Sequence, residues 1–206
     1  QHLKEHRLHS DLREGDRFNI HSFDNKIESW QGTPQPANTS TLAGAATFAK
    51  GLTARGSTDL NNGIIAGLGG KKCPAGSSPG SRYDAMILLS DGHPTTGVSN
   101  KATIHKNSIT YNCNEARIFT FAVGYGADAA LLEAVARTAR GRNYKLDNTQ
   151  ATSSLAKLAR QPFEDIYAVR VTDLSPAATG INTEEVFPAK PPDLHQLHHF
   201  HNHLYL

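Results

Sequence analysis

The chain is predicted to fold as an α/β domain that is doubly wound, with a mostly parallel sheet flanked by helices. Two observations predict this class. Short apolar runs recur along the sequence, and longer segments with apolar residues at helical spacing separate them. Strands that alternate with helices of about ten to fourteen residues form parallel sheets, because each crossover helix packs back onto the sheet.

The most informative strand is Ala85–Leu89, an apolar run that continues into Ser90, Asp91 and Gly92. Such a run, closed by turn residues, is typical of a strand that is buried on both faces. The turn places the carboxylate of Asp91 at the carboxyl end of the strand, where open parallel sheets bind their ligands. Three further runs predict strands: Phe18–Phe23, Ile118–Val123 and Asn143–Leu146.

Helices are expected where apolar residues recur every three or four positions. Five segments show this spacing: Leu3–Leu12, Thr41–Leu52, Asp59–Leu68, Ala129–Arg140 and Ser153–Ile166. Asp128 is the expected N-cap of the fourth helix, and Gly141 is expected to end it. Pro162 is expected to bend or divide the fifth helix, because proline removes a backbone donor from the helix interior.

The composition excludes some classes of partner. The 206 residues carry a formal net charge of +2, and the basic residues are scattered rather than clustered, so no nucleic acid partner is expected. No apolar run approaches the roughly 20 residues that a membrane helix needs, so this segment is not expected to span a bilayer. The chain starts at Gln1 within a charged, helix-like stretch and is expected to be an internal fragment.

Two parts are expected, a first domain over residues 1–167 and a second part over residues 168–206. Ala168–Val171 predicts one more strand, and the sequence then becomes polar and rich in proline over Glu184–Asp193. This change indicates the start of a β-rich module of a different kind. The tail from Leu194 carries five of the 11 histidines, and a disordered tail is favoured there over a transition-metal site.

A candidate metal site involves two of the expected loops. Thr58 and Asp59 precede one helix, and Asp91 follows the buried strand. Hydroxyl and carboxylate oxygens are the ligands that hard cations such as Mg²⁺ accept. The alternative is that Thr58 or Asp59 only caps its helix and Asp91 only shapes a turn, and each motif taken separately favours that alternative.

Four segments taken in order resemble a von Willebrand factor type A domain, most closely that of the inter-alpha-trypsin inhibitor heavy chains. These segments are Asp16–Asp24, Ala54–Leu60, Ile87–Gly92 and Phe121–Gly126. The resemblance runs from about Leu3 to Ile166. Beyond it, Val186–Leu194 also resembles the opening of the β-rich region that follows the domain in such heavy chains.

The resemblance implies a metal-ion-dependent adhesion site on top of the sheet. In the family this site is built from an Asp-x-Ser-x-Ser run after the first strand, a threonine from a second loop and an aspartate from a third. The matching residues are Thr58 and Asp91. The Asp-x-Ser-x-Ser run is absent from this sequence, so a divalent cation such as Mg²⁺ is expected only in the full-length protein.

The resemblance also implies a function in recognition rather than catalysis, with a protein or an extracellular-matrix ligand as partner. The family's first strand lies in the middle of the sheet, between the strands expected at Phe18 and Met86, and it has no counterpart here. Its absence leaves two unpaired apolar edges facing a slot. The segment alone is therefore predicted to be unstable or to aggregate.

Two other functions are compatible with parts of the sequence. Gly124 and Gly126 follow a strand and open a helix, as in a dinucleotide-binding loop, and Asp147 lies where a ribose-binding acid would be expected. An NAD-dependent enzyme is the alternative from that class, although Asp128 would place a carboxylate beside the pyrophosphate. The third possibility is a von Willebrand type A scaffold that binds no metal.

Cys73 and Cys113 both precede expected strands, so they fall at the amino-terminal end of the sheet, where a structural disulfide is feasible. Free buried thiols are the alternative. Two cysteines do not decide the compartment. The sequence Asn38-Thr39-Ser40 is a glycosylation sequon, which alone is weak evidence for secretion; the family resemblance slightly favours an extracellular location.

Overall fold

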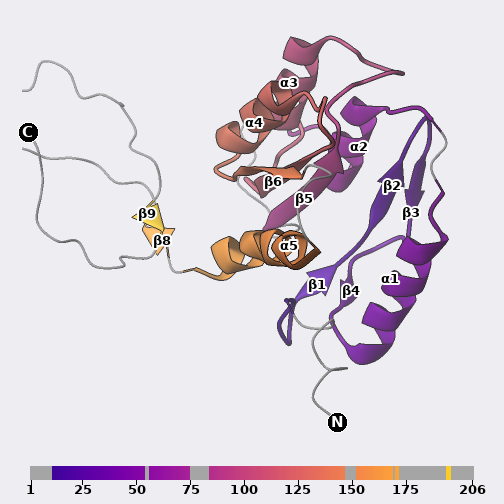
Figure 1. The fold of residues 1–206 in the computed structure, drawn as a ribbon, viewed down its shortest axis with the longest axis vertical. Coiled ribbons are helices and arrows are strands. Elements are labelled where there is room, and N and C mark those ends of the chain that lie inside the picture. Colours follow the sequence, from indigo (N-terminus) through magenta and orange to yellow (C-terminus); the bar gives the residue numbers. More distant parts are fainter. Residues whose placement is uncertain are drawn as a thin grey trace, which may run out of the picture.

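The computed structural model describes residues 11–53, 56–74, 84–146, 152–168, 170–171 and 194–195. Its centre is a parallel sheet of three strands, β5 (Ala85–Ser90), β6 (Arg117–Val123) and β7 (Asn143–Leu146), which lie side by side in that order. Figure 1 shows this sheet beneath the helices that connect its strands. The predicted α/β fold class and these three strands are confirmed.

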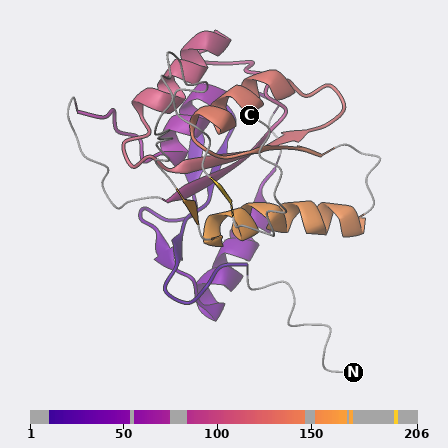
Figure 2. The same ribbon diagram turned by 90° about the vertical axis from the view of Figure 1, so that its left-hand side faces the viewer.

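Helices cover both faces of the parallel sheet, which Figure 2 shows nearly edge-on. Three helices lie on one face: α2 (Leu60–Gly67), α3 (Lys101–Thr110) and α4 (Ala129–Thr138). The opposite face is covered by α5 (Thr152–Tyr167). Side chains alternate between the two faces along each strand, and this alternation divides the core into two clusters.

The larger cluster lies between the sheet and the three helices. Leu60, Ile64, Ile118, Leu132 and Val135 are completely buried there. The smaller cluster contains Phe119, Phe121 and Tyr144, which pack against α5. The helices are therefore held mainly by burial of apolar side chains, at roughly 25 cal/mol for each Å² removed from water.

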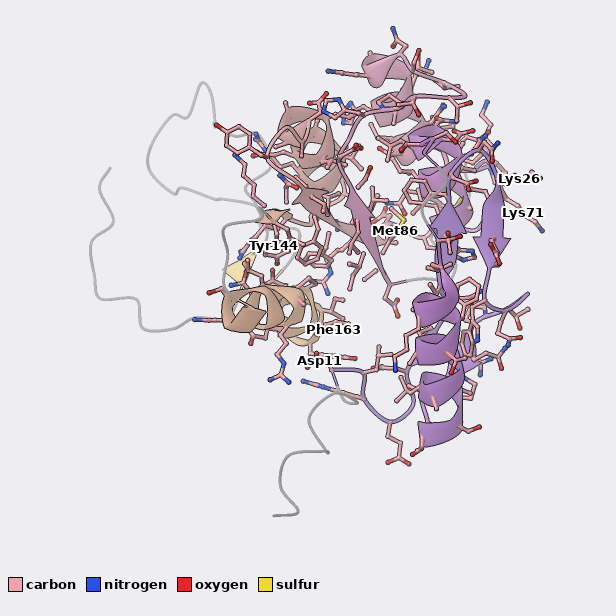
Figure 3. The ribbon with its side chains drawn as sticks, turned by 45° about the vertical axis from the view of Figure 1, so that its right-hand side comes forward. Asp11, Lys26, Lys71, Met86, Tyr144 and Phe163 are labelled. Atoms are coloured by element: carbon pink, nitrogen blue, oxygen red, sulfur yellow. A yellow bond between two sulfur atoms is a disulfide. The ribbon has the colours of Figure 1, made fainter. Side chains whose placement is uncertain are left out.

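Tyr144 of β7 points towards α5, as Figure 3 shows. Its ring stacks on Phe121 with the ring centroids 4.9 Å apart, and its hydroxyl donates to a carboxylate oxygen of Asp165 at 3.1 Å. Burial, followed by the charge and hydrogen bond of Asp165, raises the pKa of Tyr144 above its ordinary value. The guanidinium of Arg117 donates to the carbonyls of Asp165 and Ile166 at 2.7 and 2.9 Å and so closes the end of α5.

A separate antiparallel hairpin precedes the parallel sheet. Its pairs are β1 (Arg17–Phe18) with β4 (Gln35–Pro36), and β2 (His21–Phe23) with β3 (Ile27–Ser29). The helix α1 (Thr39–Gly51) follows the hairpin.

The single strand predicted over Phe18–Phe23 is wrong in one detail, because Asn19 divides it. The Oδ1 atom of Asn19 accepts hydrogen bonds from the backbone N–H of Ile20 and Gln31, and its Nδ2 donates to the Gln31 carbonyl at 2.8 Å. These bonds replace the ladder at that point, a competition with the backbone that asparagine is well suited to make.

The outer edge of β5 faces a gap in the sheet. Among the described residues no strand pairs with that edge, and the hairpin lies beyond it, linked through α2, which touches both β2 and β5. Leu89 on β5 is 57% exposed, whereas its neighbour Leu88 is buried. The predicted absence of a first central strand is confirmed in the described part of the chain.

The structure corrects several expected helices. The helix α3 was not predicted, because its sequence is polar and has no apolar stripe, and only Ile104 and Ser108 are buried in it. Pro162 does not divide α5, which continues through it. Of the first expected helix, Leu3–Leu12, residues 11 and 12 form a bend, and residues 3–10 lie outside the described residues.

Gly141 does not end α4 as predicted. The helix stops at Thr138, with Arg140 in a left-handed conformation at φ +57. Gly141 then passes directly beneath the backbone of Ile118, where a Cβ atom would collide with the carbonyl. The glycine is required for close approach of two backbones rather than for the end of the helix.

The cysteines form the disulfide that was considered feasible. Cys73 lies after α2 and Cys113 after α3, with their Cα atoms 5.1 Å apart. The bond joins the segments that follow α2 and α3, at the amino-terminal end of the sheet.

Past α5, the strand expected within Ala168–Val171 is observed as β8 (Arg170–Val171), which pairs antiparallel with β9 (Leu194–His195). The rest of residues 172–206 lies outside the described residues, as does most of the histidine-rich tail. Within the described part of the chain, no helix has the length and apolar character required to cross a membrane.

Candidate functional site

Three loops meet at the carboxyl end of the parallel sheet. They comprise residues 56–59 before α2, residues 91–97 after β5, and residues 124–128 after β6. The second and third loops are neighbours because they follow adjacent parallel strands, which end at the same edge of the sheet. The first loop does not follow a strand of this sheet and is joined to the second by backbone hydrogen bonds.

The first two loops are joined through Thr58. Its backbone N–H donates to the hydroxyl of Thr95 at 2.8 Å. Its carbonyl accepts hydrogen bonds from the N–H groups of Thr95 at 3.0 Å and Thr96 at 3.3 Å. These bonds fix the backbone position of Thr58 relative to the loop that carries Asp91, and the structure therefore places both predicted metal ligands in one connected unit.

Asp59 has a structural role beside Thr58. It is the N-cap of α2, and its carboxylate accepts from the Asn62 backbone N–H at 3.1 Å and the Asn62 side chain at 2.7 Å. Its own N–H donates to the carbonyl of Asp24, at the tip of the hairpin, at 2.7 Å. Asp59 is buried and its oxygens already have partners, so the capping alternative holds for this residue.

Asp91 keeps part of its carboxylate available. One oxygen accepts a hydrogen bond from the His93 N–H at 3.0 Å, which is the local turn expected for an aspartate here. The side chain is exposed, and the backbone carbonyl accepts from the N–H of Asp128 at 2.7 Å. Gly92 adopts φ +76 and lies against the Asp128 backbone, where a Cβ atom would come within 2.7 Å of the Asp128 carbonyl oxygen.

The third loop is fixed to the second at several points. The ring Nε2 of His93 lies 2.7 Å from the carbonyl oxygen of Gly126, and the Asp128 carboxylate forms an ion pair with Lys101 of α3. The hydrogen bond from Lys101, against the opposing effect of burial, lowers the pKa of Asp128 below its ordinary value. Tyr125 at the loop tip is 98% exposed.

The predicted ligands are thus brought together only in part. Thr58 and Asp91 offer a hydroxyl and a carboxylate from two hydrogen-bonded loops. In the part of the chain that the structure describes, no group of three or more histidine, cysteine, aspartate or glutamate side chains is arranged to hold a metal ion. Thr95, which connects the loops, was not predicted, because a threonine four residues after an aspartate is a common pattern.

The geometry of the glycine loop disfavours a dinucleotide. The start of α4, where a pyrophosphate would bind, is capped by the carboxylate of Asp128, which accepts from the Leu131 N–H at 3.3 Å. That negative charge stays ionised because Lys101 pairs with it. Asp147, the expected ribose-binding acid, lies outside the described residues.

A family model described as the von Willebrand factor type A domain matches residues 8–145. The chain belongs to this family. The match includes the hairpin, the parallel sheet and all three loops of the candidate site, and it confirms the resemblance found in the sequence.

Among curated proteins, the chain is similar to inter-alpha-trypsin inhibitor heavy chain H1. It is 33% identical to the Sus scrofa protein over 121 residues, which cover 58% of this chain and 13% of that protein. It is 27% identical to the Homo sapiens protein over 148 residues, which cover 70% of this chain and 16% of that protein. The chain therefore spans less than a fifth of the length of these relatives.

Solved structures share the fold. A von Willebrand factor type A protein from Catenulispora acidiphila superimposes with a TM-score of 0.61 at 16% identity, over 79% of this chain and 36% of that one. Proximal thread matrix protein 1 from the mussel byssus, in a form with a zinc-occupied metal-ion-dependent adhesion motif, gives a TM-score of 0.52 at 18% identity, over 77% and 38%.

Proposed function

We propose that this chain is part of a binding module that recognises a protein or an extracellular-matrix ligand through a divalent cation. Thr58 and Asp91 would contribute a hydroxyl oxygen and a carboxylate oxygen to that cation. The observation that carries the proposal is the set of hydrogen bonds between Thr58 and the residues Thr95 and Thr96, which join the loop of Thr58 to the loop of Asp91.

The donor set fits a hard cation in type but not in number. Among the described residues, the Thr58 hydroxyl and one oxygen of Asp91 have no hydrogen-bond partner, and both are the oxygen ligands that Mg²⁺ prefers. Two protein ligands leave most of an octahedral shell to water, to other protein oxygens or to the ligand. A carboxylate of the partner would fill such a position and make recognition dependent on the metal.

Binding is favoured over catalysis by the acids around Asp91. A general acid at neutral pH needs a raised pKa, whereas the pKa of the neighbouring Asp128 is lowered by Lys101. Asp59 is committed to capping α2. No described side chain at this end of the sheet combines a nucleophile with a hydrogen-bonded base, which is the arrangement that covalent catalysis requires.

The proposed domain organisation keeps the boundaries predicted from the sequence. Residues 1–167 form the von Willebrand type A domain, and residues 168–206 begin a β-rich module. The pairing of β8 with β9 supports this second part. Within the family, a scaffold without metal is the second candidate. It is favoured because no three histidine, cysteine, aspartate or glutamate side chains among the described residues are grouped to hold a metal ion.

Thermal unfolding of the complete protein tests the proposal. Mg²⁺ should raise the melting temperature of the wild type, because a ligand that binds only the folded state stabilises it. Thr58→Val and Asp91→Asn should each remove most of that rise, whereas Glu133→Gln, an exposed acid on α4, should not. An equal rise in Asp91→Asn would refute the metal role. Stabilisation by NAD without any by Mg²⁺ would support the dinucleotide alternative.

A further inference from the structure

Asn38, the first residue of a glycosylation sequon, is the N-cap of α1. It is the only asparagine of the chain that is followed at the second position by serine or threonine with no proline between. Asn38, Thr39 and Ser40 are all exposed, and the backbone of Asn38 is extended, with φ −138 and ψ 170. The acceptor side chain is therefore on the surface of the folded domain.

The two polar atoms of the Asn38 amide have different roles. Its Oδ1 accepts a hydrogen bond from the Thr41 N–H at 3.0 Å, and the Thr41 hydroxyl in turn accepts from the Asn38 N–H at 3.1 Å, completing a capping box. Its Nδ2 donates to no protein acceptor among the described residues. The oxygen is needed by the helix, and the nitrogen is available.

We propose that Asn38 is a site of N-linked glycosylation. In this reaction Nδ2 forms a bond to the anomeric carbon of an oligosaccharide carried on a polyprenyl pyrophosphate. The bond from that carbon to the pyrophosphate breaks, the lipid pyrophosphate leaves with the electron pair, and Nδ2 loses one proton. No oxidant or reductant takes part.

The product keeps the function of the unmodified side chain. Glycosylated asparagine is still an amide, so its Oδ1 continues to accept the Thr41 N–H and its Nδ2 retains one hydrogen. The capping box survives, and the helix gains a polar substituent directed to solvent.

The disulfide supplies a second, independent argument. N-linked glycans are added in the compartment where disulfides form, and disulfides are rare in the reducing cytosol. Cys73 and Cys113 are bonded, and neither residue is deeply buried. A partly accessible disulfide and an exposed sequon in one domain both indicate passage through an oxidising compartment.

The glycan would lie away from the candidate metal site. The N–H of Ala37, next to Asn38, donates to the carbonyl of Asp16 at the start of the hairpin, whereas Asp59 contacts Asp24 at its opposite tip. Between them α1 extends for 13 residues, about 20 Å at 1.5 Å per residue. Figure 1 shows α1 running from the β4 end of the hairpin towards the end where α2 begins. The sugar leaves Thr58 and Asp91 accessible.

The test uses the complete protein, secreted from eukaryotic cells. Treatment with peptide N-glycosidase in heavy-oxygen water should convert Asn38 to a labelled aspartate that mass spectrometry can locate. Ser40→Ala removes the sequon and keeps the cap, so it should abolish both the label and the gel shift. Ser40→Thr keeps both features and should remain glycosylated.

Recovery of unmodified Asn38 from the wild type and from Ser40→Thr would overturn the proposal. So would recovery of Cys73 and Cys113 as thiols together with an unlabelled Asn38. The result does not depend on the metal proposal, because Ser40→Ala leaves the Thr58 and Asp91 loops unchanged and Mg²⁺ stabilisation should persist in it.

Discussion

Gly97 lies against the side chain of Asp59, so that a Cβ atom built on Gly97 would come within 2.5 Å of the Asp59 Oδ2 atom. Gly97 also has φ +67, a left-handed conformation that side chains rarely adopt. The loop after β5 therefore packs directly against Asp59, the N-cap residue of α2, and this packing requires glycine at position 97.

Gly97→Ala should destabilise the domain. The left-handed backbone alone costs roughly 1–2 kcal/mol for a residue with a Cβ, and the collision with the Asp59 cap adds to that cost. Gly126→Ala is the matched control in the neighbouring loop, since its Cβ would meet nothing within 4 Å. Chemical denaturation of the complete protein measures the difference, and equal stability of the two variants would contradict the prediction.

Thr95→Val should weaken both stability and Mg²⁺ binding. It removes the acceptor for the Thr58 N–H, at a cost of about 1 kcal/mol. Because Thr58 then loses a constraint, the Mg²⁺-induced rise in melting temperature should fall. Thr96→Val is the control, since Thr96 contacts Thr58 only through its backbone. A larger loss in Thr96→Val would show that the side chain of Thr95 is not the link.

Lys101→Met should destabilise the domain in a pH-dependent way. Lys101 lowers the pKa of Asp128, so its stabilisation is present above the ordinary aspartate value of 3.8 and is lost as the pH falls through the lower folded pKa. Because Lys101 is 62% exposed, a loss of about 1 kcal/mol at neutral pH is expected. Denaturation at neutral and acid pH should show that the free energies of unfolding of the wild type and of Lys101→Met become equal in acid. Lys106→Met, on the same helix, should show no such convergence.

The open edge of β5 should make the isolated 206-residue segment prone to aggregation. Leu89→Lys should reduce aggregation several-fold while changing the free energy of unfolding by less than about 0.5 kcal/mol, because Leu89 is 57% exposed. Ile109→Lys, on the surface of α3 and 51% exposed, should have little effect on aggregation. Light scattering distinguishes them, and a sharp, reversible melting transition of a soluble wild-type monomer would argue against the open edge.

Most of the central fold could be predicted from the sequence. Apolar runs such as Ile118–Val123 are uninterrupted, and caps such as Asp128 are placed one residue before their helices. The helix α3 was missed because its own residues show no helical spacing of apolar side chains. It is held instead by burial of Ile104 and by its contacts with α2 and α4. The break at Asn19 was missed because it depends on a partner, Gln31, twelve residues away.

The candidate site was less predictable than the fold. Thr58 and Asp91 carry a recognisable pattern, but their connection through Thr95 and the seating of Gly97 on Asp59 arise only when the loops are folded together. Lys101, which keeps Asp128 ionised, is likewise brought in by a helix that has no apolar signature. Contacts between distant loops leave no periodic trace in a single sequence.

The disulfide between Cys73 and Cys113 makes a covalent ring of the segment that contains β5, the Asp91 loop and α3. A protease that cuts the backbone once inside this ring produces two polypeptides that stay joined. The nicked molecule would migrate as a single species until it is reduced. Proteolytic damage there would thus leave Thr58 and Asp91 tethered within one covalent unit.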